Sequence, residues 1–263
     1  MKRWIVLLLA MMVSPVRAEW QARADWADFF REAGVTGTLL VHAERDDAWL
    51  VHNAERAHVA YSPASTFKLF NALVALETGV LADEHDVLRW DGETRWLPIW
   101  NRDHSLASGM RYSVVWLNQE VARRVGQTCM DAWLQRVGYG NTESGGGIDQ
   151  FWLRGGALRI TAEQQIAFVR SLAAGTLPFR PEVQEAVRRI ALMEDGTDHA
   201  IHAKTGWASR DNAPDIGWHV GWVERAGARW FFALNIDMAT PDDTPKRFAI
   251  TRRALETLGA LPR

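Results

Sequence analysis

The segment Ser65-Thr66-Phe67-Lys68 places a serine hydroxyl three residues before a lysine amine. Residues three apart share one face of a helix, so the two groups can meet if a helix begins here. A serine hydroxyl is a weak nucleophile at neutral pH and needs a base beside it. Lysine can be that base only where burial removes its charge, and Phe67 and Leu69 predict an apolar wall that would do so. The spacing therefore indicates a serine–lysine site for acyl transfer.

A Ser-x-x-Lys match alone is not specific, because the same residues could form an ordinary helix start. In that alternative Ser62 or Ser65 caps the helix and Lys68 is solvated. Two further elements favour the chemical interpretation. Ser113 stands at the expected opening of a central helix and can present a second hydroxyl. Lys204-Thr205-Gly206 is expected to end a late strand, where Lys204 and Thr205 could hold a substrate carboxylate and Gly206 would let a ligand lie against the strand edge.

The elements that must position these groups can be predicted from periodicity. Two strand-like runs joined by a charged turn predict an early β-hairpin. Helical periodicity then dominates the middle of the chain, and apolar strand-like runs return after residue 196. The strands are expected at 37–42, 48–52, 199–204, 216–225 and 229–237, and the helices at 114–125, 130–137, 162–174, 181–192 and 244–258, with a glycine-rich loop at 138–156. Strands at both ends predict one sheet built from both termini and a helical insertion between them.

Composition limits the possible functions and the compartment. The chain has 263 residues, 48% of them hydrophobic, and a net charge of -2, which gives no general argument for nucleic acid or an acidic membrane as partner. Residues 1–18 combine a basic start, an apolar run and a terminal Ala18, as a signal peptide does. Cys129 is the only cysteine, so no intramolecular disulfide can form. Export without a disulfide is typical of a bacterial periplasm.

Further motifs connect these elements to a known family. Ser113-Val114-Val115, Tyr139-Gly140-Asn141 and Phe151-Trp152-Leu153 follow the first motif and precede Lys204-Thr205-Gly206. In this order they resemble the class D serine β-lactamases, the oxacillinases, from about Trp20 to the C-terminus. The stretches 100–104 and 216–224 look closest to the carbapenem-hydrolysing subgroup.

The resemblance implies an α+β fold with three α/β/α layers, as in serine β-lactamases and penicillin-binding transpeptidases. Its central antiparallel sheet would come from residues 19–59 and 197–263. An all-helical region would occupy residues 60–196, giving one β-lactamase domain at 19–263 after the signal peptide.

The resemblance also implies a role for each motif residue. Ser65 would be acylated by the β-lactam, and Ser113 would relay a proton to the leaving nitrogen. The Lys68 amine would react with carbon dioxide, with no other cofactor and no metal, to give a carbamate that is the general base in acylation and deacylation. The sequence is compatible with this modification, because the Trp152 indole could donate to the carbamate and Val115 and Leu153 could form dry walls.

The remaining implied roles concern substrate binding. Lys204 would assist electrostatically, and Thr205 and Arg247 would bind the drug carboxylate. The backbone N–H groups of Ser65 and Trp207 would form the oxyanion hole, with Gly206 beside them. The expected partners are small-molecule β-lactams, with no nucleic acid and no membrane after cleavage of the signal, and the protein would be a periplasmic monomer or homodimer.

Two alternatives and two departures remain open at the level of sequence. A β-lactam sensor or a penicillin-binding transpeptidase would share the serine–lysine site without hydrolysing the drug. In the carbapenemase subgroup an acidic residue after Phe-Trp-Leu can pair with an arginine beyond Lys-Thr-Gly. This chain has Arg154 and Arg210 at those positions, so that pair cannot form as such, and His202 replaces an arginine linked to dimerisation there.

Overall fold

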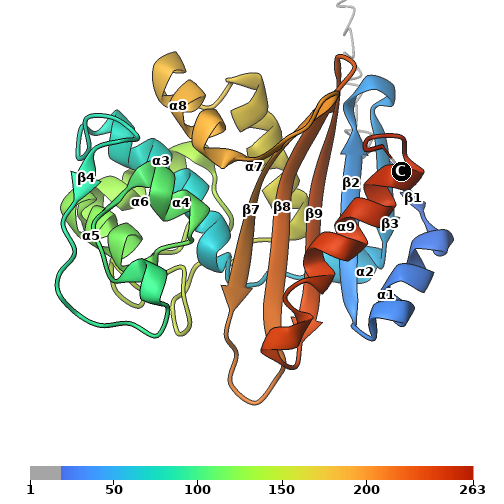
Figure 1. Cartoon of the computed structure of the whole chain (residues 1–263), viewed down its shortest axis with the longest axis horizontal. Helices are drawn as coiled ribbons and strands as arrows, with labels where there is room; N and C mark the ends of the chain where they lie inside the picture. The colour runs from blue at the N-terminus through green and yellow to red at the C-terminus, as the bar shows by residue number, and fades with distance from the viewer. Residues whose placement is uncertain (1–18, 263) are drawn as a thin grey trace, which may run out of the picture.

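The computed structural model describes residues 19–262, so the predicted signal peptide lies outside the described residues. A seven-stranded sheet crosses the molecule in the order β1-β3-β2-β9-β8-β7-β6 (Figure 1). Its strands are β1 (Trp20–Ala22), β2 (Gly37–Ala43), β3 (Ala48–His52), β6 (Leu192–Asp195), β7 (His199–Ala208), β8 (Asp215–Arg225) and β9 (Ala228–Met238). Both chain ends supply strands, as predicted, because β2 pairs with β9. Neighbouring strands are antiparallel except β1 and β3, which are parallel.

Helices cover both faces of this sheet and make the predicted three layers. The helices are α1 (Ala27–Ala33), α2 (Ala54–Ala57), α3 (Lys68–Glu77), α4 (Leu106–Arg111), α5 (Val115–Val125), α6 (Gln127–Val137), α7 (Ala162–Ala174), α8 (Pro181–Ala191) and α9 (Lys246–Thr257). Helix α7 packs on β8, β9 and β2, whereas α9 packs on β8 and β9 from the other side and α1 packs against α9. In Figure 1 the helices from the middle of the chain gather beside β7.

Strand β9 shows how alternation builds two cores. Phe231 and Ala233 belong to the core shared with α3 and α7, while Phe232 and Leu234 belong to the core under α9. Successive side chains of a strand point to opposite faces, so one apolar strand can serve both layers. The unbroken apolar run at 230–234 follows from burial on both faces.

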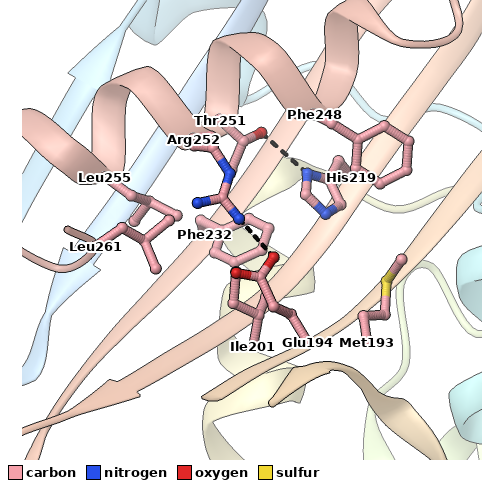
Figure 2. Close-up of a pocket in the computed structure, with 10 residues that line it drawn as sticks. All are labelled: Met193, Glu194, Ile201, His219, Phe232, Phe248, Thr251, Arg252, Leu255 and Leu261. Carbon is pink, nitrogen blue, oxygen red and sulfur yellow. Dashed lines mark hydrogen bonds and ion pairs between the residues drawn. The ribbon is translucent and has the colours of Figure 1, made fainter. Parts of the chain in front are cut away.

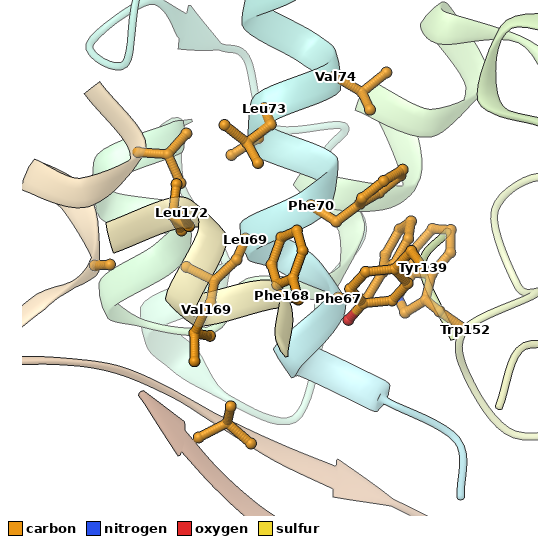
Figure 3. Packing of buried hydrophobic residues seen from close by; sticks show 14 of the residues in the cluster. Phe67, Leu69, Phe70, Leu73, Val74, Tyr139, Trp152, Phe168, Val169 and Leu172 are labelled. Atoms are coloured by element: carbon orange, nitrogen blue, oxygen red, sulfur yellow. The ribbon is translucent and has the colours of Figure 1, made fainter. Parts of the chain in front are cut away.

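The core around α3 is aromatic and lies next to the predicted nucleophile (Figure 3). Phe67 stacks on Trp152 with ring centroids 4.7 Å apart, and Phe70 packs against Tyr139 at 4.9 Å. Phe168 of α7 contacts Tyr139 edge-on at 5.0 Å. These rings connect the start of α3 to the glycine-rich loop and to α7, which fixes the site's position in the fold.

Three details differ from the sequence-based expectation. The insertion is not entirely helical, because β4 (Val87–Leu88) pairs with β5 (His104–Ser105) in a second, two-stranded sheet. Strand β6 lies within the stretch predicted to be helical, yet it pairs with β7. Strand β7 does not end at Lys204-Thr205-Gly206 but continues to Ala208, because it stays paired with β8 up to Ile216. Strands of two to four residues are too short for periodicity to reveal.

Candidate active site

Ser65 lies in a short 3-10 turn, Ala64–Phe67, that runs directly into α3. Ala64 has a φ of +46°, in the left-handed region that residues other than glycine rarely adopt. Its backbone N–H donates to the carbonyl of Trp152 at 3.0 Å, and the Ser62 hydroxyl donates to the same carbonyl at 2.7 Å. The Trp152 carbonyl, in the glycine-rich loop, therefore holds the turn that carries Ser65 in its strained conformation.

Lys68 meets the two conditions that a lysine base requires. Its Nζ atom donates to the Ser65 Oγ at 2.9 Å, and the residue is only 1% exposed. Burial, with a smaller contribution from the positive charge of Lys204, holds the pKa of Lys68 well below its usual value. A neutral amine at this distance can accept the hydroxyl proton. The alternative of a solvated lysine at a simple helix start is therefore wrong.

The Trp152 side chain places a free hydrogen-bond donor in this buried region. Trp152 is fully buried against Phe67, and its Nε1 has no hydrogen-bond partner among residues 19–262. A buried indole N–H normally donates to an acceptor, and leaving such a group unpaired costs about 1–3 kcal/mol. The free donor indicates that an acceptor belongs next to it.

Gly206 has a packing role in addition to the one that the sequence suggested. A Cβ atom at this position would lie 2.8 Å from the Pro63 carbonyl oxygen and 3.3 Å from Cγ2 of Thr66. A side chain here would therefore push β7 away from the turn that carries Ser65. The glycine is required first by the close approach of two backbone segments, and it also lines the cavity described below.

Ser113 and Val115 lie where α4 passes into α5. Ser113 has a φ of +55°, and α5 begins two residues later at Val115. The Ser113 N–H donates to the carbonyl of Met110 at 3.3 Å, which closes the end of α4. Both residues line the same cavity as Ser65, as the motif order predicted.

Lys204 lies on β7 with its amine out of solvent. The residue is 4% exposed, and Nζ donates to the carbonyl and the hydroxyl of Thr205 at 3.0 and 3.3 Å. Burial is the main cause that lowers the pKa of Lys204 to about 7, and the positive Arg247 adds to it. The amine is therefore close to half neutral at pH 7, and a bound anion would favour its charged form.

Arg247 brings a second cation to this site from the start of α9. Its Nη1 donates to the carbonyl of Gly206 at 2.7 Å, and Nε donates to the carbonyl of Thr244 at 3.1 Å. Burial lowers the pKa of Arg247 to about 10, so the guanidinium stays charged at neutral pH. Thr205 and Arg247 both line the cavity, which is the arrangement expected for binding a carboxylate.

One cavity of about 640 Å³ gathers most of the predicted residues. Its lining comprises Ser65, Trp96, Leu97, Trp100, Tyr112, Ser113, Val115, Thr205, Gly206, Trp207, Ser209, Asp215, Thr244 and Arg247. Lys68, Trp152 and Lys204 are buried outside this lining. Leu153 is partly buried against the core and also lies outside it, so the structure does not bring that predicted wall residue to the cavity.

Sequence reasoning allowed a few tryptophans to line a pocket without saying that Trp96 and Trp100 would form an aromatic wall, and it missed an acidic partner. Trp96 is 77% exposed, and its ring lies 6.0 Å from that of Trp100 across an edge contact. Asp215 accepts a hydrogen bond from the Trp207 indole at 2.6 Å, which orients that side chain at the cavity. The clustering of tryptophans before residue 101 was a usable signal for the wall. Nothing in the sequence marked Asp215.

The two arginines at the subgroup's pair positions each find a carboxylate. Arg154 forms an ion pair with Asp211, which lies in the loop between β7 and β8. Arg210 pairs with Asp237 at 3.0 Å. Arg154 and Arg210 do not pair with each other, as expected. The loop after Lys-Thr-Gly still forms an ion pair with the segment after Phe-Trp-Leu. In this chain the arginine of that pair, Arg154, is in the segment after Phe-Trp-Leu, and the carboxylate, Asp211, is in the loop.

Neither a metal-binding cluster nor a membrane-spanning helix is present in the described part of the chain. Within residues 19–262, no group of three or more His, Cys, Asp and Glu side chains is arranged to hold a metal ion. His199 lies 2.8 Å from Glu194, whereas His202 stacks on Trp222 with centroids 4.6 Å apart. Over the same range no helix is long and apolar enough to cross a bilayer.

Comparison with known proteins agrees with this geometry. The penicillin-binding protein transpeptidase domain matches residues 35–256. Beta-lactamase OXA-48 of Klebsiella pneumoniae is 42% identical over 259 residues, which cover 98% of this chain and 97% of the relative. Probable beta-lactamase YbxI of Bacillus subtilis is 36% identical over 250 residues, which cover 90% of this chain and 92% of the relative. The class D β-lactamase YbXI from Nostoc superposes with a TM-score of 0.87 at 40% identity, covering 90% of this chain and 99% of that one. FUS-1 (OXA-85), a class D β-lactamase of Fusobacterium nucleatum, superposes with a TM-score of 0.88 at 33% identity, covering 92% of this chain and 100% of that one.

The fold and the family match show that the chain belongs to the penicillin-binding protein transpeptidase family. Within that group it belongs to the class D β-lactamases, and it is an enzyme that hydrolyses β-lactams. The resemblance stated from the motifs, the α+β fold and the enzyme class are therefore confirmed. The roles of individual site residues stay predictions.

Proposed function

We propose that the enzyme hydrolyses β-lactams through a Ser65 acyl-enzyme, with Lys68 N-carboxylated and acting as the general base in both steps. The observation that carries this proposal is the buried amine of Lys68, which lies 2.9 Å from Ser65 Oγ and whose pKa is held well below its usual value. The preceding residue, Phe67, stacks on Trp152. Only a neutral amine can add to carbon dioxide. The modification would supply an anionic base, and the free Trp152 indole N–H is a suitable donor to hold it. The residues present therefore fit the group.

The test compares Trp152→Phe, which keeps an aromatic ring against Phe67, with wild type. We expect acylation of Ser65 by a penicillin to stay measurable in the variant, while release of the acyl group slows by about 100-fold or more. Single-turnover mass spectrometry follows both steps. Equal loss of both steps would contradict the role of Trp152.

Carbon-13 bicarbonate tests the modification independently. We expect one new carbamate resonance in wild-type enzyme, absent in Lys68→Ala and retained in Lys204→Met. Activity lost at low pH should return when bicarbonate is added, because protonation of the Lys68 carbamate breaks its N–C bond and releases carbon dioxide, and a higher concentration of carbon dioxide reverses that loss. Wild type without the resonance and indifferent to bicarbonate would refute the carbamate but leave Ser65 chemistry standing.

We further propose penicillins and oxacillin as substrates, with some activity on carbapenems. An aromatic wall of Trp96, Trp100 and Tyr112 supports this range, because it offers apolar contact to varied drug side chains. Steady-state kinetics with a penicillin, oxacillin and a carbapenem test it, and kcat/KM for the carbapenem indistinguishable from the Lys68→Ala background would remove that substrate. We place the mature enzyme in the periplasm on the basis of the signal-like residues 1–18. N-terminal sequencing of the exported protein tests cleavage after Ala18.

A further inference from the structure

A second cavity, of about 110 Å³, lies between α9 and the sheet (Figure 2). It shares no lining residue with the active-site cavity. Its walls are mostly apolar and include Ile201, Phe232, Leu255 and Leu261, all members of the core under α9. Met193 and Phe248 stand at its exposed side, 52% and 38% accessible. An apolar cavity of about 150 Å³ in another protein holds benzene. This space is smaller, but it opens to solvent beside Met193 and Phe248, so a single ring can enter with one edge at the surface.

His219 brings one polar atom to this apolar space. The residue is on β8 and 6% exposed, and its Nδ1 lies 3.1 Å from the hydroxyl oxygen of Thr251. That hydroxyl donates its only proton to the carbonyl of Arg247 at 2.8 Å. The Nδ1 atom must then be the protonated one, and it donates to Thr251. This tautomer follows from the hydrogen-bond network.

The other ring nitrogen is therefore an acceptor without a partner. Figure 2 shows Nε2 of His219 on the side of the ring away from Thr251, facing Met193. No side chain or backbone group of residues 19–262 donates to Nε2. Burial and the charge of Arg247 lower the pKa of His219 to about 3, so the ring is neutral at pH 7 and Nε2 keeps its lone pair.

The charges at the mouth of the cavity cancel. Arg252 of α9 donates to the Glu194 carboxylate, and both side chains are about two-fifths exposed. A charged ligand would gain nothing from this balanced pair and would lose solvation inside. The occupant should be neutral, apolar over most of its surface, and able to donate one hydrogen bond.

We propose that this cavity binds a neutral single-ring phenol, with its ring among the apolar side chains and its hydroxyl donating to Nε2 of His219. The rings of Phe232 and Phe248 flank His219 with centroids 4.9 and 4.8 Å away, which favours an aromatic occupant over an aliphatic one. The site is distinct from the β-lactam site and does not depend on its mechanism.

Fluorine NMR titration of the mature protein tests the proposal with two probes that differ in the hydroxyl alone. With Ser65 blocked by a boronic acid, we expect 4-fluorophenol to bind saturably and fluorobenzene to bind about fivefold more weakly, as one hydrogen bond supports. The methyl resonance of Met193 should shift with the phenol. Equal affinities, no saturation, or no shift at Met193 would overturn the proposal.

The variant His219→Phe keeps a ring and removes the acceptor. We expect the preference for 4-fluorophenol to fall to within about twofold, while fluorobenzene still binds. A preference unchanged from wild type would overturn the assignment to Nε2. Should this variant not fold, the comparison of the two probes on wild type decides the matter alone.

Discussion

Replacing Lys204 with methionine should stabilise the protein at pH 7 and destabilise it at pH 10. The folded protein holds the pKa of Lys204 at about 7, against 10.5 for an ordinary lysine. The unfolded chain therefore binds more protons at this residue throughout the range between those values. Stability then rises with pH across that window, and at pH 7 the lysine opposes folding.

The magnitude follows from the two pKa values and the contacts of the amine. The difference corresponds to about 4 kcal/mol against folding at pH 7 and under about 1 kcal/mol at pH 10, where the unfolded amine also loses its proton. Methionine removes this opposition but also two hydrogen bonds to Thr205, worth roughly 1 kcal/mol each. The net change in unfolding free energy should be about +2 kcal/mol at pH 7 and about -1 kcal/mol at pH 10.

Urea denaturation of wild type and Lys204→Met at both pH values measures this change of sign. The control Val115→Ala alters the active-site cavity without replacing a titratable group, and it should shift the unfolding free energy equally at both pH values. An equal effect of Lys204→Met at pH 7 and pH 10 would refute the idea that the buried amine is held largely neutral.

Two further predictions concern backbone packing and a surface pair. In Gly206→Ala the new Cβ meets the Pro63 carbonyl at 2.8 Å, so kcat/KM should fall at least about tenfold and stability by about 1–3 kcal/mol. Gly145→Ala, where the nearest atom is 3.4 Å away, is its control, and activity of Gly206→Ala equal to that control would contradict this reading. Arg154→Ala breaks an ion pair whose side chains are 63% and 69% exposed, so urea unfolding should change by less than about 1 kcal/mol. A larger loss of unfolding free energy would contradict this expectation and would mean that the Arg154–Asp211 pair is needed to hold the β7–β8 loop in place.

The fold was predictable where periodicity was long and clear. The hairpin of β2 and β3, the helix α7 and the return to strands after residue 196 all lie where the patterns placed them. Strand β6 was not predictable, because its four residues are largely exposed at the sheet edge and show no alternation. The parallel pairing of β1 with β3 depends on long-range packing of a three-residue segment.

The site was predictable as a set of motifs but not as a set of contacts. Motif order brought Ser65, Ser113 and Thr205 to one cavity. A second requirement for Gly206, the close approach of the backbone of the nucleophile turn, could not be predicted because only the folded structure shows it. Asp215 and the Arg154–Asp211 pair depend on how the β7–β8 loop folds, which spacing along the chain does not determine.

Burial and a chain of neighbouring charges together explain why the Lys68 amine can lose its proton. Burial is the main cause that lowers the pKa of Lys204 and of Lys68; charged Arg247 adds to the shift of Lys204, and Lys204 adds to that of Lys68. The effect has one direction, because Arg247 keeps the highest pKa of the three and Lys68 is buried most deeply. A substrate carboxylate near Thr205 and Arg247 would offset this positive charge when it arrives. Burial and this positive charge therefore favour the neutral form of the Lys68 amine in the free enzyme, which is the form that adds carbon dioxide in the proposed mechanism.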